Sequence, residues 1–470
     1  MSPDVVVLGG GFAGLSAAAS LAEAGARVLV LEARPTLGGR ASSFTDPSTG
    51  ERVDNGQHLM LGCYHETFAF LARIDALENV RVQADLEVAF VDRAGRPSVL
   101  SCPPLPSPLH LLGGLLEWNG LPFRDRLSVV NMATSLRRAR RFVTSGKGYL
   151  PASPGETVDS WLIRNGQSRG LRDMLWEPLA LAALNQPPSE AAAPAFVRVL
   201  GQMFGPDRRD SAIALPIVPL GQMYAEPARR FIEARKGEVR VSSPALVRLR
   251  NAGESPGQVW GASSGLPLVH AVEVRGETIL TGAVVAAVPW FALPDLFAGE
   301  ASLLEPILAA ARATAPSPIV TVNLWLDRPV LEGPIVGLPG RTFQWVFDKR
   351  QVFGDSASHL SFVSSGAASI VARTNEALAR LAMDELTQAV PRARNARVER
   401  SVVVRERRAT FSLAPGQPAR PATSTPVSGL YLAGDWIETG LPATIEGAVV
   451  SGHRAAAACR ARLQPCQVAP

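Results

Sequence analysis

The sequence has few cysteines, few lysines and no apolar run long enough to cross a membrane. Only four of its 470 residues are cysteine: Cys63, Cys102, Cys459 and Cys466. Their spacing matches neither a metal site nor a disulfide framework, so we expect no bound metal and a reducing compartment, the cytoplasm. No run of consecutive apolar residues reaches the ~18–20 residues of a membrane-spanning helix.

Lysine is so rare that arginine supplies almost all of the net charge of +5, because only three lysines occur. Such a basic balance suits either nucleic acid or an anionic membrane surface. The sequence contains no nucleic-acid motif, so we expect the membrane to be the partner. The first predicted strand begins at Asp4 and is needed for the fold, so we also expect no secretory leader.

The first forty residues combine a strand, a glycine-rich turn, a helix and a second strand. After Asp4, residues 5–8 read V-V-V-L and are apolar and mostly β-branched, which predicts a strand buried on both faces. Gly9 permits a sharp turn, Gly11 lets the backbone approach a pyrophosphate, and Gly14 lets the next helix lie close to the strand. Glu32 ends the second strand, where an acid can accept both hydroxyls of a ribose. This pattern predicts a dinucleotide-binding βαβ unit.

A second glycine pair indicates which dinucleotide binds. Residues 32–40 read E-A-R-P-T-L-G-G-R, a string that resembles the flavin amine oxidase and phytoene desaturase superfamily. In that superfamily the diglycine and its arginine hold the pyrophosphate of FAD. A guanidinium such as that of Arg40 can bind two phosphate oxygens at once. The resemblance therefore implies FAD as the cofactor.

Two further strings are similar to one branch of this superfamily. Residues 55–64 read N-G-Q-H-L-M-L-G-C-Y, and residues 176–188 read W-E-P-L-A-L-A-A-L-N-Q-P-P. The first looks like the carotenoid and squalene branch rather than the amine oxidases. The second closely resembles the squalene-associated branch, the hydroxysqualene dehydroxylases of bacterial hopanoid pathways. In this superfamily the first segment passes beside the flavin ring, which makes His58 the candidate catalytic residue. A structural hydrogen bond under the flavin is the alternative role for His58.

The end of the chain carries the other strong signal. Residues 434–448 read G-D-W-I-E-T-G-L-P-A-T-I-E-G-A, after a strand predicted to end at Ala433. The resemblance places Gly434 and Asp435 at the ribityl-phosphate end of the flavin. A helix from about Ala443 then directs its N-terminus at the pyrimidine carbonyls of the flavin. No cysteine lies in this segment, so we expect FAD to bind without a covalent link.

The resemblance also implies the set of residues that contact FAD. Residues 237–247 look like the strand that passes the adenine, with Ala245 at the usual backbone contact. The expected FAD-binding residues are Gly9, Gly11, Phe12, Ala13, Gly14, Glu32, Ala33, Arg34, Gly39, Arg40, Gly56, Gln57, His58, Ala245, Gly434, Asp435, Ala443, Thr444 and Ile445.

Two regions depart from the dinucleotide pattern and predict a substrate pocket. Residues 176–185 contain too few charges for a surface helix, so this helix is buried or lines a cavity. Residues 319–326 and 359–364 read as strands, and three alternating aromatics at 343–347 predict an aromatic sheet face. Lys349 follows in a predicted turn. The expected substrate-pocket residues are Trp176, Leu184, Asn185, Phe343, Trp345, Phe347 and Trp436.

These elements predict an α/β fold of two interleaved domains, because 470 residues exceed what a single core usually supports. We expect a Rossmann-type FAD-binding domain that is discontinuous, comprising residues 1–90, 206–300 and 415–470. Residues 91–205 and 301–414 are expected to form a substrate domain of α+β type, with an antiparallel sheet and helices.

The resemblance implies an FAD-dependent oxidoreductase that removes the allylic hydroxyl of hydroxysqualene by hydride delivery from the reduced flavin N5, giving squalene. Its partners would be a C30 isoprenoid substrate and neighbouring enzymes of the squalene pathway. A carotenoid-type polyene desaturase, a flavin amine oxidase and a flavin-bearing scaffold without turnover remain as alternatives. The sequence identifies neither the acid that protonates the hydroxyl nor the electron donor.

A membrane-facing surface is expected between residues 110 and 141. Residues 110–118 are strongly apolar, and Arg137, Arg138, Arg140 and Arg141 close the helical pattern that follows. An apolar patch beside clustered arginines is typical of proteins that lie on an anionic bilayer without spanning it. We therefore expect peripheral attachment to the inner face of the cytoplasmic membrane. A substrate-domain helix pair with a solvated arginine end is the alternative.

Overall fold

A five-stranded parallel sheet forms one half of the protein. The computed structural model describes the chain except residues 1, 48, 251–266, 300, 355–356 and 464–470. Every residue of the three central strands of this sheet is buried, as expected of apolar strands covered on both faces. In sheet order the strands are β10 (Glu238–Arg240), β2 (Val28–Leu31), β1 (Val5–Leu8), β14 (Val284–Ala286) and β21 (Leu430–Leu432).

Helices from both ends of the chain pack on one face of this sheet. They are α1 (Phe12–Glu23), α2 (His65–Arg73), α10 (Glu226–Glu233) and α14 (Ile445–Leu463). The α1 helix lies so close to its neighbours that two contacts exclude any side chain. A Cβ on Gly14 would lie 1.9 Å from the Gly9 carbonyl oxygen, and one on Gly452 would lie 2.3 Å from that of Ala13. The helix therefore packs closely at Gly14, as the sequence predicted.

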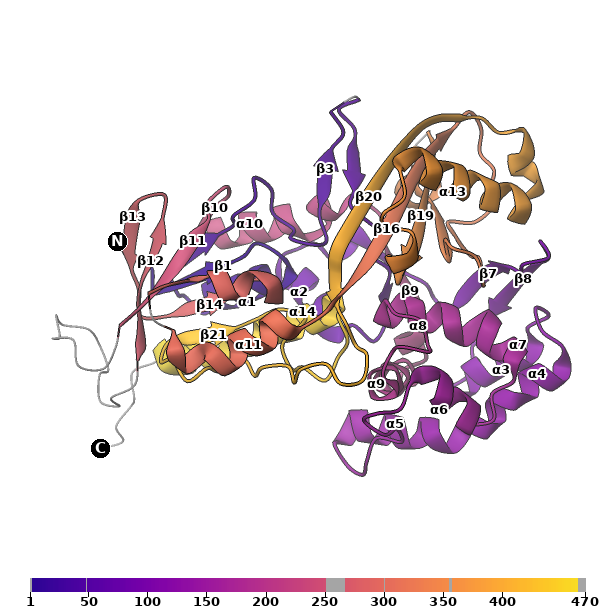
Figure 1. The fold of residues 1–470 in the computed structure, drawn as a ribbon, viewed down its shortest axis with the longest axis horizontal. Coiled ribbons are helices and arrows are strands. Elements are labelled where there is room, and N and C mark those ends of the chain that lie inside the picture. Colours follow the sequence, from indigo (N-terminus) through magenta and orange to yellow (C-terminus); the bar gives the residue numbers. More distant parts are fainter. Residues whose placement is uncertain (1, 48, 251–266, 300, 355–356, 464–470) are drawn as a thin grey trace.

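The other face of the parallel sheet is covered by a smaller sheet and one helix (Figure 1). The sheet is antiparallel except for its last strand, in the order β13 (Glu277–Leu280), β12 (Leu268–Val274), β11 (Ala245–Arg250) and β15 (Phe297–Ala298). The helix is α11 (Glu305–Ala313). The parallel sheet is therefore enclosed on both sides.

A seven-stranded sheet forms the upper part of the other half in Figure 1. One face packs on α13 (Asn375–Ala389), and the opposite face looks toward the first half. Its order is β20 (Val398–Phe411), β16 (Pro316–Leu326), β19 (Ser358–Ser365), β18 (Trp345–Asp348), β17 (Ile335–Gly337), β7 (Glu87–Val91) and β8 (Pro97–Ser101). Strand β7 thus crosses the expected domain boundary at residue 90.

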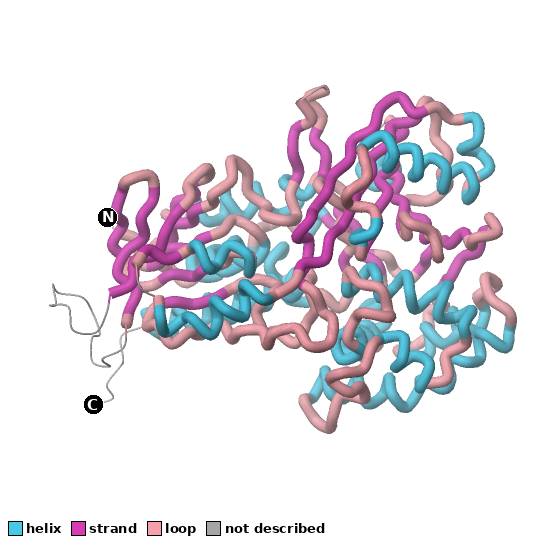
Figure 2. The backbone as a smooth tube through the Cα atoms, in the orientation of Figure 1, coloured by secondary structure: helices cyan, strands magenta, loops and turns pink. Residues whose placement is uncertain are grey.

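Helices gather beneath this sheet, as the cyan segments of Figure 2 show. They are α3 (Leu109–Glu117), α4 (Phe123–Leu127), α5 (Ala133–Ser145), α6 (Val158–Arg164), α7 (Arg169–Leu171), α8 (Glu177–Leu184) and α9 (Ala193–Met203). Trp118, Trp161 and Trp176 are fully buried among them and fill their common core.

Several short elements complete the structure. Two of the turns, η3 (Arg172–Trp176) and η5 (Gly221–Ala225), have π-helical geometry. The small strands are β3 (Ser43–Thr45), β4 (Arg52–Asp54), β5 (Met60–Leu61), β6 (Val80–Val82) and β9 (Ile213–Pro216), and a short helix is α12 (Lys349–Phe353). The 3₁₀ turns of the described residues are η1 (Leu77–Asn79), η2 (Ser128–Met132), η4 (Arg208–Ser211), η6 (Trp290–Asp295), η7 (Ser302–Leu304), η8 (Ala367–Ser369) and η9 (Pro391–Asn395).

The structure agrees with the predicted fold class, a Rossmann-type unit with an antiparallel sheet and helices, but it corrects three local expectations. Lys349 does not lie in a turn: it begins α12 and is 1% exposed. Phe343 precedes β18 and packs edge-on against Phe362 in the core beneath α13, away from the sheet face of Trp345. An irregular segment before the strand breaks the alternation that the sequence suggested.

The third correction concerns the apolar residues 110–118. Helix α3 buries His110, Leu111 and Leu115, and Trp118 is buried just after it. These side chains form core, since they pack against other helices of the same layer. This segment therefore does not supply the exposed apolar surface that the sequence suggested.

Candidate functional site

A cavity of about 660 Å³ begins at the carboxyl ends of the parallel strands and extends beneath the seven-stranded sheet. Parallel α/β sheets commonly bind ligands at this edge, where loops after several strands converge. Both halves of the protein contribute to its walls, so its shape depends on the whole chain.

The glycines of the first turn form one end of the cavity. Gly9 adopts φ 109°, a conformation that favours glycine. A Cβ on Gly11 would lie only 3.7 Å from the Gly39 Cα, so two glycine backbones face each other across the space. No side chain caps the N-terminus of α1. Its free N–H groups and the two bare backbones make a cradle that fits a pyrophosphate.

Glu32 is fixed at the end of β2 by backbone donors. Its Oε2 accepts a hydrogen bond from the Gly10 N–H at 2.6 Å, and its Oε1 accepts one from the Arg34 N–H at 2.8 Å. The side chain is 7% exposed and lines the cavity. Each carboxylate oxygen keeps acceptor capacity, so the group can also bind two ribose hydroxyls.

Arg40 and Asp435 meet on the wall of the cavity although 395 residues separate them. The guanidinium also donates to the Ala409 carbonyl at 3.0 Å and lies 5.6 Å from the Trp290 ring centroid. These contacts fix the orientation of the guanidinium. The position fits an arginine that binds phosphate oxygens of the cofactor.

Tyr224 is a supporting residue that the sequence analysis missed. Its ring stacks on Phe12 with centroids 3.6 Å apart, and its hydroxyl donates to the carbonyls of Gly38 and Ala41 at 2.8 and 3.0 Å. Tyr224 therefore connects the first helix to the diglycine turn. Because it lies on a separate segment, no local motif marks it.

The middle of the cavity lies between two segments that the sequence assigned to the flavin ring. Residues 55–58 form one wall and residues 443–445 form another, with α14 beginning at Ile445. Glu446 fixes this helix because its carboxylate accepts from the backbone N–H groups of Glu66 and Thr67 at 3.0 and 2.9 Å. Burial raises the pKa of Glu446. The N-terminus of α14 is thus held toward the cavity.

His58 lines the cavity deep inside the protein. Burial is the main cause that lowers the pKa of His58 to about 4; the charges of Lys349 and Arg40 act in the same direction, and that of Asp54 opposes them. The imidazole is therefore neutral near pH 7. A neutral imidazole can accept a proton on one nitrogen and donate from the other, but it is a poor store of protons.

Another part of the lining is mainly apolar, with Gln202 and Ser211 as polar exceptions. It combines side chains from β5, β7, β8, α8, α9 and β18, which is why no sequence segment predicted it alone. The lining residues here include Leu59, Leu61, Leu86, Val88, Phe90, Leu100, Leu175, Leu179, Val199, Met203, Ile213, Trp345, Phe347 and Val363. An elongated hydrocarbon fits such a surface, because few polar groups there would lose their hydration.

The cavity contains most, but not all, of the residues predicted to form the site. Of the expected FAD contacts only Gly14 is outside the lining, and it instead packs against Gly9. Of the expected substrate residues, Asn185, Trp345 and Phe347 are in the lining. Asn185 ends α8 at φ 52° and is also a structural link, since its Nδ2 donates to Ser317 and Thr410.

Four residues assigned to the substrate pocket do not line this cavity. Trp176 and Leu184 are buried in the helical core, where the Trp176 indole donates to the Gln167 side chain at 3.0 Å. Phe343 lies beneath α13, as described above. Successive side chains of a helix point to different sides. In an apolar helix the sequence does not tell which of these sides faces a cavity.

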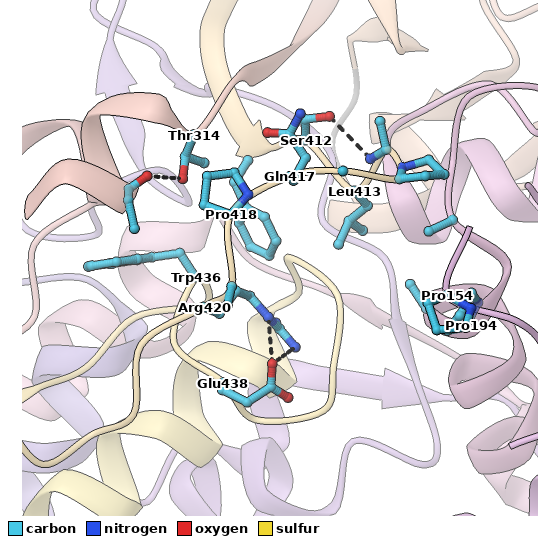
Figure 3. Close-up of a pocket in the computed structure, with 18 of the residues that line it drawn as sticks. Pro154, Pro194, Thr314, Ser412, Leu413, Gln417, Pro418, Arg420, Trp436 and Glu438 are labelled. Atoms are coloured by element: carbon cyan, nitrogen blue, oxygen red, sulfur yellow. Dashed lines mark hydrogen bonds and ion pairs between the residues drawn. The ribbon is translucent and has the colours of Figure 1, made fainter. Parts of the chain in front are cut away.

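Trp436 is the fourth, and it belongs to a separate pocket of about 460 Å³ (Figure 3). There it lies near Pro418 and the Arg420–Glu438 ion pair, whose shorter contact is 2.9 Å. The Trp436 indole donates to the Val288 carbonyl at 3.0 Å. This hydrogen bond attaches the loop after Asp435 to the segment that contains Val288.

Asp54 and Lys349 form a buried ion pair just behind residues 55–58. The Lys349 Nζ lies 2.9 Å from the Asp54 Oδ2, and both side chains are at most 4% exposed. Asp54 Oδ1 also accepts from the Ser43 hydroxyl at 2.8 Å and the Leu220 N–H at 3.0 Å. The pair attaches α12 to the segment beside the cavity.

Comparison with known proteins agrees with this site. Residues 12–460 match the family described as flavin containing amine oxidoreductase. A hydroxysqualene dehydroxylase from Rhodopseudomonas palustris is 31% identical, over 97% of this chain and 98% of that protein. One from Sinorhizobium fredii is 30% identical, over 97% and 98%. A 15-cis-phytoene desaturase from Narcissus pseudonarcissus is 25% identical, over 96% of this chain and 78% of that protein.

Solved structures show the same fold at lower identity. An oxidoreductase from Methanosarcina mazei superposes with a TM-score of 0.71 at 18% identity, covering 96% of this chain and 99% of that one. Cyclohexylamine oxidase from Brevibacterium oxydans gives 0.68 at 17% identity, covering 98% and 100%. The predicted fold class, the FAD cofactor and the resemblance to the squalene-associated branch are thereby confirmed.

We predict that Glu32→Ala raises the dissociation constant of FAD roughly 10- to 100-fold, because charge-assisted hydrogen bonds to ligand and turn are lost at about 1.5–3 kcal/mol. Flavin released by acid precipitation and measured by absorbance quantifies the bound FAD. Glu23→Ala, at the exposed end of α1, is the control and should retain wild-type affinity. Flavin that stays with the precipitated protein would contradict non-covalent binding.

We also predict that substitutions of Lys349 and Asp54 have non-additive effects on the free energy of unfolding. Lys349→Met leaves a buried carboxylate without its cation and should lower the free energy of unfolding by about 3–5 kcal/mol. The double variant with Asp54→Asn should recover a large part of that loss, which urea denaturation can measure. Arg52→Met breaks the exposed Arg52–Glu226 pair two residues away and should cost no more than about 1 kcal/mol. Additive effects of the two buried changes would contradict the coupling.

Proposed function

Because this chain belongs to the flavin-containing amine oxidoreductase family and is an FAD-dependent oxidoreductase, we propose that it reduces hydroxysqualene to squalene in hopanoid or triterpenoid synthesis. The reaction replaces an allylic hydroxyl by hydrogen. Reduced FAD supplies the hydride in this chemistry, from N5 to an allylic cation.

The observation that carries the proposal is the apolar extension of the FAD cavity. Most of the side chains in this part of its walls are leucine, valine, phenylalanine and tryptophan, with Gln202 and Ser211 as polar exceptions. An allylic cation reacts with water as readily as with hydride, so a productive site must exclude water. The apolar lining serves that purpose and accommodates a long isoprenoid chain.

The relatives support the same substrate class and leave one competing reaction. Those named hydroxysqualene dehydroxylase align over nearly their full length. Those named phytoene desaturase align less completely and favour, as a second candidate, the desaturation of a polyene. An amine oxidase is less well supported, because Lys349 is paired with Asp54 and lies outside the cavity lining.

We predict that anaerobic enzyme with reduced FAD is reoxidised by hydroxysqualene and forms squalene in equal amount. Flavin absorbance follows reoxidation, and gas chromatography identifies the product. Phytoene with oxidised enzyme is the comparison, since a desaturase would instead reduce its flavin. No flavin reoxidation with hydroxysqualene would overturn the proposed function, and flavin reduction by phytoene would favour the second candidate.

A membrane surface is the proposed source of the substrate. A chain of roughly thirty carbons gains more than ~20 kcal/mol on leaving water at ~0.8 kcal/mol per methylene, which exceeds the range of non-covalent affinities. The substrate therefore resides in lipid, and the cavity must receive it from there. None of the described helices is long and apolar enough to span a bilayer.

The apolar patch proposed for membrane contact consists of Phe123, Leu127 and Val130. They follow one another at intervals of three or four residues along α4 and η2 and are 60%, 43% and 51% exposed. Helix α5 continues the chain, with Arg137, Arg138 and Arg141 exposed and Arg140 half-buried. Apolar side chains beside arginines suit the head-group region of an anionic bilayer.

We predict that replacing Arg137, Arg138, Arg140 and Arg141 by serine lowers co-sedimentation with anionic vesicles, because each arginine contributes about 1 kcal/mol near the surface. Turnover of vesicle-borne substrate should fall with it. FAD content and turnover of detergent-solubilised substrate should change little. Unchanged vesicle binding at physiological salt would show that the arginines are only a solvated helix face.

A further inference from the structure

The sheet face above the cavity changes from apolar to polar along β16 and β19. Trp345, Phe347 and Val363 line the cavity, whereas Thr321, Asn323 and Ser361 on the same face do not. Asn323 pairs with Ser361 across the two strands, and Thr321 pairs with Val363. Thr321, Asn323 and Ser361 are at most 1% exposed. We call these three residues the polar layer.

Each residue of the polar layer has a polar atom without a hydrogen-bond partner among the described residues. These atoms are Thr321 Oγ1, Ser361 Oγ and Asn323 Nδ2. The other amide atom of Asn323 lies 3.0 Å from the His359 Nε2, so one amide atom is free whichever way the amide is turned. Buried polar atoms of this kind usually bind ordered water.

The opposite face of the same strands shows that this polarity is local. Val320, Val322 and Leu324 alternate with the polar residues on β16 and are buried in the core beneath α13. Leu360 and Phe362 do the same on β19. Nothing in the stability of the sheet requires three hydroxyl or amide groups above the cavity, and apolar groups would cost less there.

The polar layer reaches His58 through the space beside Gly56. A Cβ placed on Gly56 would lie 3.6 Å from the Thr321 Oγ1 and 3.8 Å from the His58 Nε2. Thr321 and His58 are therefore separated by a distance that about one or two water molecules can span. His58 itself lines the cavity, so it connects the layer with the site of reaction.

The Lys349–Asp54 pair is connected to the polar layer through residues close to each partner in the chain. Phe347, two residues before Lys349, pairs with Ser361 in the sheet. Asp54 lies two residues before Gly56 in the chain. Burial and then the charge of Lys349 lower the pKa of His359 to about 3, so this ammonium acts on the imidazole that contacts Asn323.

We propose that the polar layer holds ordered water and, together with the Lys349–Asp54 pair, passes a proton to His58 for the departing hydroxyl. This inference rests on the proposed function. The carbon–oxygen bond of the alcohol breaks, and the hydroxyl leaves as water with the proton from His58. The hydride that forms the new carbon–hydrogen bond comes from reduced FAD, which is thereby oxidised, and solvent reprotonates the layer. Thr321, Asn323 and Ser361 are positioning residues, because they act through water and His58.

The test is the anaerobic reoxidation of fully reduced enzyme by hydroxysqualene in H₂O and D₂O. Thr321→Val keeps the shape of the side chain and removes the hydroxyl, and Ser361→Ala removes the next one. Each should slow reoxidation tenfold or more and increase the solvent isotope effect, because proton delivery becomes rate-limiting. Thr321→Ser retains a hydroxyl and should restore most of the rate. FAD content and reduction by dithionite should remain those of the wild type.

Ser364→Ala is the matched control, because Ser364 lies on the opposite face of β19 and is also buried. It should leave the rate and the isotope effect unchanged. Wild-type rates and isotope effects in both Thr321→Val and Ser361→Ala would overturn the relay alone, as would slower rates without a change in isotope effect. A wild-type enzyme that hydroxysqualene does not reoxidise would overturn the proposed function and the relay with it.

Discussion

The ion pair between Arg40 and Asp435 brings the two ends of the chain together, and the site depends on it. Arg40 follows the diglycine turn after β2, and Asp435 follows β21, the last strand of the parallel sheet. The parallel pairing of β1, β14 and β21 and the close packing of α1 on α14 at Ala13 and Gly452 bring these two segments to the same edge of the sheet. The glycine cradle and the N-terminus of α14 are therefore fixed relative to each other, and any loosening of the helix packing would separate residues 9–14 from residues 443–445.

The proposed reaction needs two environments that are normally incompatible. For that reaction the apolar end of the cavity must be dry, because water would capture a cationic intermediate. Removal of a hydroxyl nevertheless needs a proton, which water carries best. The fold separates the two requirements on one sheet face: aromatic and aliphatic side chains of β18 and β19 line the cavity, while the polar layer on β16 and β19 lies behind His58. The low pKa of His58 suits a group that transfers a proton and does not retain it.

Relatives named for different reactions share this architecture. Hydroxysqualene dehydroxylases and phytoene desaturases both align with nearly the whole of this chain, and the amine oxidases share its fold at under 20% identity. A flavin held by a rigid parallel sheet can accept or donate hydride. The second half of the protein then decides what reaches the flavin, by the side chains it places over the ring.

The sequence by itself determined the fold class, the cofactor and most of the cradle, because those functions lie in short contiguous strings such as residues 9–14, 32–40 and 434–445. Their glycines and charges act through the local backbone, so their spacing is sufficient evidence. Only the tertiary structure decided the rest. Tyr224, the Lys349–Asp54 pair and the polar layer depend on contacts between distant segments, and Trp176 and Phe343 were assigned to the wrong surface for the same reason. Periodicity in the sequence shows which residues share a face of a helix or strand, but the packing of both halves decides which buried face lines a cavity.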